Sequence, residues 1–181
     1  FHQPANNVLE WSTALDSGIC MANLCEDWVD ESFWRKAYNL SSGKDYRFAT
    51  WELAGMSLEP MGVKYEDIYD PQDVAHFNFH GQYFTDSDKL EEHLHFRQLP
   101  GAVYWGAVKA EMERMMANPM VAAMMPDAAA MRAHNKEIAA KRMGPVWMEE
   151  NSETDWIQAF FGSLEEKHAS KPFALHHPDE K

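Results

Sequence analysis

The chain has 181 residues, of which 45% are hydrophobic and 25% are charged, and this length and composition fit one globular domain rather than a disordered chain. Its 29 acidic and 16 basic residues give a formal net charge of −13, which argues against nucleic acid and against unaided binding to anionic lipid. No uncharged apolar stretch approaches the ~18 residues that a membrane span needs, so the sequence predicts no transmembrane helix.

The two cysteines and the first residue of the chain bear on the cellular compartment of the protein. Cys20 and Cys25 lie in a stretch that reads as helical, where a step of five residues turns the side chain by about 140°, so the two thiols should point apart. We therefore expect no disulfide and a reducing compartment. The chain begins with Phe1 instead of Met, and we expect that a targeting segment has been removed.

The first half of the sequence reads mostly as helix. Apolar spacing predicts a short helix over residues 8–16, an amphipathic helix over 19–40 and a third helix over 45–58. Val74 to Phe84 reads VAHFNFHGQYF, in which aromatic and polar residues alternate, so this segment is predicted to be a strand or an extended arm.

The second half returns to a helical period. We predict helices over residues 86–99, 102–117, 126–143 and 152–169, because Pro100, Asn118-Pro119 and Gly144-Pro145 interrupt the pattern between them. Lys171 to Lys181 contains two prolines and no period, which indicates an extended arm. The expected fold is a single mostly α domain over residues 1–181, with extended arms and one short extended or β excursion.

Two Glu-x-x-His pairs are the strongest catalytic pattern in the sequence. Residues at i and i+3 of a helix share a face, so two such pairs with two further glutamates could form a di-iron site in a helical bundle. The residues of this alternative are Glu31, Glu92, His95, Glu111, Glu165 and His168. Because the chain has 29 acidic residues and 9 histidines, and charged neighbours flank the pairs, a solvated helix face is the favoured interpretation.

Other candidate ligands also have a simpler interpretation. His76 and His80 would lie about 13 Å apart in a strand, too far to share one metal ion, and His176 and His177 would point apart in an extended tail. Seven methionines could suggest copper, but their helical spacing indicates an apolar face in the core or at a partner interface. These are Met112, Met115, Met116, Met120, Met124, Met125 and Met131.

A family resemblance begins at Met61 to Pro71, which reads MGVKYEDIYDP. This stretch resembles the Gly-Leu-Arg-Tyr-Asp-Asp-Leu-Tyr-Asp-Pro segment of the subunit 7, or ubiquinone-binding-protein, family of the mitochondrial cytochrome b–c1 complex (complex III). Gln98-Leu99-Pro100 and Met124-Met125-Pro126 resemble the two Leu-Pro elements that follow in the family. The resemblance covers residues 45–143, between an N-terminal helical extension over 1–44 and a C-terminal helix and tail over 144–181.

Two other respiratory families share features with the chain. PGAVYWGAVK, from Pro100 to Lys109, resembles the Trp-x-x-x-Lys helix of the ATP synthase stalk subunit d. Leu99 to Glu149, which ends in PVWMEE, resembles a small subunit of the hydrophilic arm of complex I. All three resemblances imply one class, a non-catalytic accessory subunit on the matrix side of the mitochondrial inner membrane.

The complex III resemblance implies partners rather than substrates. It implies cytochrome b and the core proteins as neighbours, no cofactor or metal, and no catalytic residue. Seven tryptophans are more than a domain of this size easily buries, and aromatic residues are enriched at interfaces. Helical spacing in the 65–69 turn and aromatic alternation in the 74–84 arm indicate further contacts with partner subunits. For the turn, docking within the chain on Phe48 and Trp51 stays open as an alternative. The predicted interface residues are Tyr65, Ile68, Tyr69, Phe77, Phe79, Tyr83 and Trp105.

Overall fold

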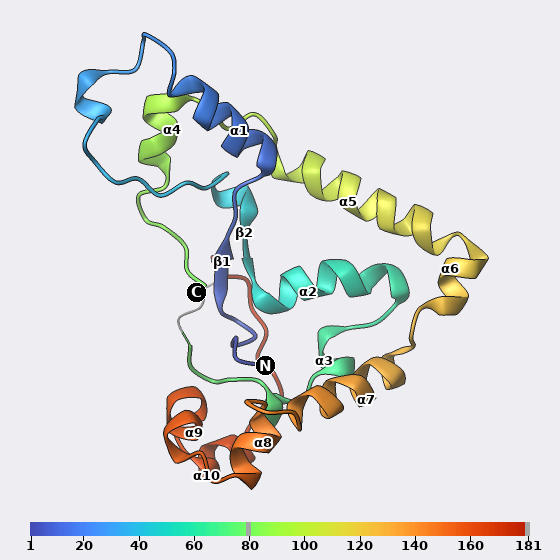
Figure 1. Ribbon diagram of the computed structural model, residues 1–181. Helices are drawn as coiled ribbons and strands as arrows, with labels where there is room; N and C mark the ends of the chain where they lie inside the picture. The colour runs from blue at the N-terminus through green and yellow to red at the C-terminus, as the bar shows by residue number, and fades with distance from the viewer. Residues whose placement is uncertain (79–80, 180–181) are drawn as a thin grey trace.

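A computed structural model describes residues 1–78 and 81–179 of the protein. Within these residues the chain forms ten α-helices, four short 3-10 helices and one sheet of two strands. The prediction of a mostly α fold with one short β excursion is confirmed (Figure 1). In the same described residues, no helix combines the length and the apolar character needed to cross a membrane.

The sheet is not formed by residues 74–84, the segment in which aromatic and polar residues alternate. β1 (Val8–Glu10) pairs antiparallel with β2 (Arg47–Ala49), and Leu9 faces Phe48 across the pair. The predicted helix over residues 8–16 is therefore wrong over residues 8–13, and residues 14–16 begin the following helix. A three-residue strand is too short to show a period of its own, so its apolar residues merged with those of the following helix.

Helix α1 (Ala14–Asn23) begins at an N-cap. The side chain of Thr13 accepts a hydrogen bond from the backbone N–H of Asp16, which satisfies one of the free donors at the helix start. The predicted helix over residues 19–40 is wrong beyond Asn23, because the chain then turns and forms only a 3-10 helix at Glu31–Phe33. Beyond Asn23, Phe33 is buried, and Leu24, Val29 and Tyr38 pack against the cluster to which it belongs, through turns instead of along one helix face.

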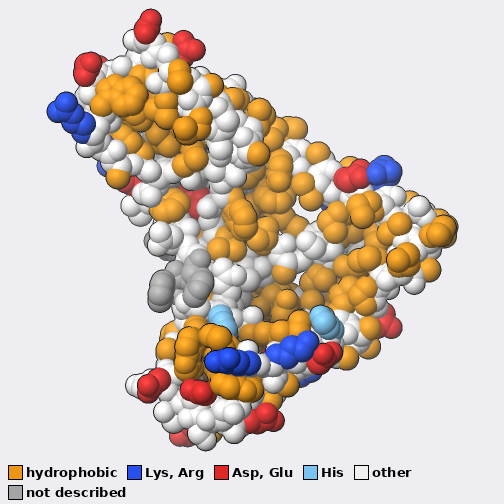
Figure 2. Space-filling view, viewed as in Figure 1, with side chains coloured by type: hydrophobic (Ala, Val, Ile, Leu, Met, Phe, Trp, Pro, Cys, Tyr) orange, Lys and Arg blue, Asp and Glu red, His pale blue; other side chains and the backbone are white. Residues whose placement is uncertain are grey.

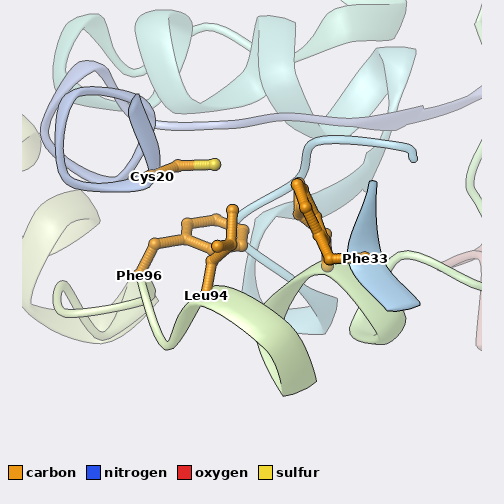
Figure 3. Close-up of a cluster of buried hydrophobic side chains, with 5 residues drawn as sticks. Cys20, Phe33, Leu94 and Phe96 are labelled. Carbon is orange, nitrogen blue, oxygen red and sulfur yellow. The ribbon is translucent and has the colours of Figure 1, made fainter. Parts of the chain in front are cut away.

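A first hydrophobic cluster joins these N-terminal elements to α4 (Asp88–Leu94) (Figure 3). Its buried members are Cys20, Phe33, Leu90, Leu94 and Phe96. Helix α4 ends earlier than the predicted range of 86–99, since His95 has a positive φ of 46° and the N–H groups of Phe96 and Arg97 donate to the Glu91 carboxylate. Within this region both cysteines are free thiols, one buried and one exposed.

A second cluster holds the central helices. Helix α2 (Thr50–Leu58) follows β2, so the predicted helix over 45–58 is correct only from Thr50 onward. Helix α3 (Tyr65–Ile68) packs against α7 (Ala128–Ala139), which is shorter than the predicted 126–143. The cluster contains Leu58, Val63 and Ile68, with Met61, Tyr69, Ala128 and Met131 packed against it.

Helix α5 (Gly101–Met116) agrees with the predicted helix over 102–117 within one residue. Its start after Pro100 and its end before Pro119 were both marked in the sequence. The side chain of Asn118 accepts from the backbone N–H of Met120 and thereby caps α6 (Pro119–Met124). Figure 1 shows α5 extending away from α4 to a corner at α6, from which α7 returns toward α8.

The C-terminal region is built from α8 (Pro145–Glu150), α9 (Thr154–Phe161) and α10 (Leu164–His168). The single helix predicted over 152–169 is wrong, because Gly162 has a φ of +85° and separates α9 from α10. Gly144-Pro145 begins α8 as well as closing the preceding turn. A third cluster lies here and contains Ala75, Met148, Ile157, Phe160 and Phe161.

The segment predicted as a strand or extended arm forms neither helix nor strand over residues 74–78 and 81–84. The backbone N–H groups of His76 and Phe77 both donate to the carbonyl of Phe160, at 2.8 and 3.0 Å, which fixes the first part of the segment to α9. The β excursion predicted for this position is instead the β1–β2 pair. Residues 171–179 likewise lack regular structure, in agreement with an extended tail.

Candidate protein-interaction surface

The α5–α6 arm, defined as Gly101–Met124, is mostly exposed. Of the residues of α5, only Gly101 is buried, and α6 contains no buried residue. Figure 2 shows hydrophobic side chains at the corner of the molecule where α6 lies. Met120 and Met124 are 76% and 81% exposed there, so the arm presents apolar side chains to solvent instead of covering a core.

One face of α5 does pack against the rest of the chain. Trp105, Val108 and Met112 are partly buried at helical spacing, and α5 contacts the 3-10 helix Glu59–Met61. Large apolar side chains on its other faces are exposed. Those of the arm and of the segment directly after it are Val103, Tyr104, Met115, Met120, Met124 and Met125.

Exposed aromatic residues also gather in the N-terminal region. Trp11, Trp28 and Trp34 are 46%, 50% and 45% exposed. Trp28 stacks on the ring of His95 at a centroid distance of 6.0 Å, and Trp34 meets Phe33 edge to face at 5.1 Å. Trp28 and Trp34 thus each have a ring contact within the chain and still expose about half of their surface. The expectation from the sequence that this domain cannot bury all its tryptophans is met by these three residues.

The predicted interface residues of the 65–69 turn lie largely inside the chain. Tyr65 and Ile68 are 4% and 6% exposed, and Tyr69 is partly buried. The ring of Tyr65 lies 4.5 Å from that of Tyr69 and 5.2 Å from that of Phe173. Burial, together with the nearby Tyr69, raises the pKa of the Tyr65 hydroxyl. The 65–69 turn therefore docks within the chain, as the alternative from the sequence stated. The surface on which it docks is formed by α7 and the tail, whereas the alternative had named Phe48 and Trp51.

The remaining predicted interface residues differ in exposure. Phe77 is 56% exposed and Tyr83 is 46% exposed, with the Arg47 guanidinium 4.4 Å above the Tyr83 ring. Trp105 is partly buried against Phe48 at 4.9 Å. Its indole Nε1 is buried and has no acceptor in the described part of the chain. Phe79 lies outside the described residues.

The two Glu-x-x-His pairs are far apart. Glu92 lies on α4 and His95 directly after its end, whereas α10 carries Glu165 and His168, and Figure 1 shows these two helices at opposite ends of the molecule. The Nε2 of His168 lies 2.9 Å from Glu149, which also accepts from the buried Lys167. These two hydrogen bonds lower the pKa of the Glu149 carboxyl. Across residues 1–78 and 81–179, no three His, Cys, Asp or Glu side chains converge as metal ligands would.

His76 makes a contact that resembles a catalytic pair. Its Nε2 lies 2.8 Å from the Ser170 hydroxyl oxygen in a cavity of about 500 Å³. However, that hydroxyl donates its proton to the carbonyl of Lys167 at 2.6 Å, so the imidazole is left to donate to the oxygen rather than to withdraw the proton. The pair therefore fastens the 74–78 segment to the end of α10. His80 lies outside the described residues, and His176 contacts the carbonyl of Ala174 within the tail.

The comparisons with known proteins gave no match: no family model, no curated protein and no solved structure resembles the chain detectably. The residues with most exposed apolar surface, Met120 and Met124, belong to the methionine group noted in the sequence. Their spacing indicated an apolar face, but it could not distinguish a core face from an exposed one. That distinction required the position of α6 at the outer corner of the fold.

Proposed function

We propose that the chain is a non-catalytic structural subunit of a multi-protein assembly, and that this assembly is mitochondrial complex III. In this proposal the chain lies peripherally on the matrix side of the inner membrane and contacts cytochrome b and the core proteins. It stabilises the subunits that transfer electrons from quinol to cytochrome c and takes no part in the chemistry itself.

The accessible surface of the chain is the observation that carries the structural part of the proposal. A compact monomer of 20.9 kDa exposes about 9,000 Å². This chain exposes 11414 Å², an excess of roughly 2,400 Å² over that expectation. A stable interface removes about 800 Å² from each partner, so the excess is enough for an extensive interface or for several smaller ones.

The chemistry of the exposed side chains supports the same proposal. Methionine and aromatic residues are enriched at the centres of protein interfaces, whereas charged residues are depleted there. The α5–α6 arm presents two strongly exposed methionines within Ala117–Met124, a stretch without a single charged residue. Burying one such methionine in a partner would contribute about 1.5–3 kcal/mol.

The choice of complex III depends on the resemblance of residues 61–71 to the subunit 7 family. In the structure these residues hold α3 against α7 and the tail, so they would preserve the shape of the subunit while other surfaces make the contacts. Subunit d of ATP synthase and the small complex I subunit are the competing assignments, and they belong to the same class.

The proposal is tested by recovering the chain with its assembly. A tagged chain expressed in its source organism is purified under native conditions, separated on a native gel and identified with its partners by mass spectrometry. Complex III subunits and quinol–cytochrome c reductase activity should accompany it. Recovery with ATP synthase or complex I would replace the assignment but keep the class, and a folded chain that migrates alone would overturn both.

A charge introduced on the arm tests the surface itself. The double variant Met120→Glu, Met124→Glu alters two strongly exposed side chains, so the isolated chain should melt as the unaltered one does while its recovery with the assembly is lost. Met21→Glu is the matched control, since Met21 is 62% exposed on α1 and lies outside the arm. Equal recovery of the double variant and the control would contradict the role of the arm.

A further inference from the structure

A groove runs beside helix α2 and is separate from the exposed faces of the α5–α6 arm. Its volume is about 580 Å³, and it lies between α2, the start of α3 and the C-terminal tail. Apolar side chains form its walls, namely Trp51, Met56, Val63, Tyr65 and Leu175. We call this cavity the α2 groove. The space-filling view shows hydrophobic side chains around the hollowed region between α5 and α7, where α2 lies (Figures 1 and 2).

The groove extends toward α5. A second cavity of about 260 Å³ is lined by Trp105, Gly106 and Val108, and it shares Met56 and Glu59 with the α2 groove. The two cavities therefore lie on either side of these two side chains. Two adjoining apolar cavities of this kind suit a helical segment of a protein, which inserts side chains at successive turns.

Glycine at position 55 keeps the groove open. Gly55 lies within α2, where glycine is less favourable than alanine by roughly 1 kcal/mol. A Cβ built at this position would meet no atom within 4 Å, so no side chain of the chain occupies that space. An approaching backbone could come close to α2 at this point.

The carboxylates around the groove decide what kind of segment fits. Glu52, Glu59 and Glu66 line it together with Lys64, and Lys109 lines the adjoining cavity. Glu52 accepts from the backbone N–H of Ala49, and Glu59 pairs with Lys109 of α5 at 2.8 Å. Glu66 is exposed, and the chain as a whole carries a net charge of −13. Both the local and the overall field therefore favour a positively charged partner and oppose an anionic ligand.

We propose that the α2 groove binds an amphipathic helix of a partner protein, with apolar residues facing Trp51 and Met56 and with lysine or arginine residues beside Glu59 and Glu66. The inference rests on the proposed function in that it presupposes a partner subunit, and it specifies the chemistry of one contact. It uses a surface that the arm variants leave intact, so the two proposals fail separately.

The test is a selection of peptides on the full chain. A library of random 16-residue peptides, displayed on their encoding RNA, is selected on the immobilised chain, and peptides retained by a Gly55→Leu chain are removed. Selected peptides should combine apolar residues at helical spacing with flanking lysine or arginine. Their affinity is then measured by fluorescence anisotropy at low and high salt. Selection of acidic or uncharged peptides, or of none, would overturn the proposal.

Three variants locate the binding site. Gly55→Leu places a side chain in the groove without a clash at Cβ and should weaken binding at least tenfold. Glu59→Gln with Glu66→Gln alters only exposed side chains and should weaken binding about fivefold at low salt, with a smaller effect at high salt. Gly18→Leu is the control, because Gly18 is an exposed helical glycine of α1 with equal free space.

The outcomes separate the groove from the rest of the surface. Unchanged binding to the Gly18→Leu chain, together with weaker binding to both groove variants, supports the proposal. Equal binding to the wild-type and Glu59→Gln, Glu66→Gln chains overturns the charge argument even if Gly55→Leu disturbs folding. If no peptide binds and the chain is still recovered with its assembly, the groove proposal fails while the proposed function stands.

Discussion

Removal of the Glu10 carboxylate should strongly destabilise the protein. The side chain of Glu10 is fully buried and accepts hydrogen bonds from the hydroxyls of Ser41 and Ser87, the backbone N–H of Phe84 and the guanidinium of Arg47. The Glu10 carboxylate thereby connects β1 to β2 through Arg47. It also connects β1 to Ser41, which precedes β2, and to the loop before α4 through Phe84 and Ser87. Burial by itself would raise its pKa, but these hydrogen bonds and the Arg47 charge hold the pKa of Glu10 below its ordinary value.

The magnitude follows from the groups that Glu10→Ala leaves behind. Arg47 is only 16% exposed and would lose a partner 3.1 Å away, retaining Asp179 at 3.4 Å, while the N–H of Phe84 would lose its acceptor. Breaking a buried ion pair from one side costs about 3–5 kcal/mol, which is a large part of the ~5–15 kcal/mol that stabilises a typical domain. For a chain of this length we expect the melting temperature to fall by roughly 10 °C.

Thermal unfolding followed by circular dichroism measures this effect. Glu10→Gln should give a smaller decrease, because the amide oxygen can still accept from the N–H of Phe84 and from Arg47, while the NH₂ group can donate to the hydroxyl oxygens of Ser41 and Ser87. Glu111→Ala is the control, since Glu111 also pairs with an arginine, Arg114, but on the exposed surface of α5. If Glu10→Ala lowers the melting temperature no more than Glu111→Ala does, the reasoning from burial is refuted.

Three further predictions concern the isolated chain. Phe96→Ala should lower the free energy of unfolding in urea by about 3–5 kcal/mol, because Phe96 is fully buried, whereas Phe77→Ala at a 56% exposed position should change it far less. Because burial raises the pKa of Tyr65, Tyr65→Phe should leave the phenolate absorbance at pH ~10 unchanged, and a clear decrease there would contradict this. Since the pKa of Glu10 is lowered in the folded chain, its contribution to stability is present above about pH 4.3 and is lost as the pH falls further. Urea unfolding at pH 6 and pH 3.5 should therefore show a smaller pH effect for Glu10→Gln than for the wild-type chain.

The sequence predicted α5 well because strong signals bracket it. Pro100 cannot continue a preceding helix, and Asn118-Pro119 ends the apolar period sixteen residues into α5 and provides a cap for the next helix. The predicted helix over 19–40 shows the opposite case. Its apolar residues recur at steps of three and four, but Phe33 stacks on Tyr38 at 4.7 Å across a turn, so the same spacing served tertiary packing. Periodicity alone could not separate the two situations.

The candidate surfaces were less predictable than the helices. The 65–69 turn has an apolar stripe that fits a partner or the chain's own α7 equally well, and only the fold shows that Ile68 packs with Ala128 and Met131. The α2 groove left no local signal, since it is lined by residues from Trp51 to Leu175 and depends on how the tail returns to α2. Glu10 was likewise unremarkable in the sequence, because its partners lie 31 to 77 residues away.

The distribution of buried residues explains why a chain of ordinary composition exposes so much apolar surface. Within the described residues the core is divided into three clusters, one between α1 and α4, one beneath α3 and α7 and one around α8 and α9. Separate small clusters bury less surface per residue than one shared core of the same membership, because each has its own boundary with solvent. The α5–α6 arm spans the distance between the first two clusters without contributing a large buried side chain to either. A helix in this position gains little stability from its own chain, which supports the proposal that its apolar side chains bind a partner surface.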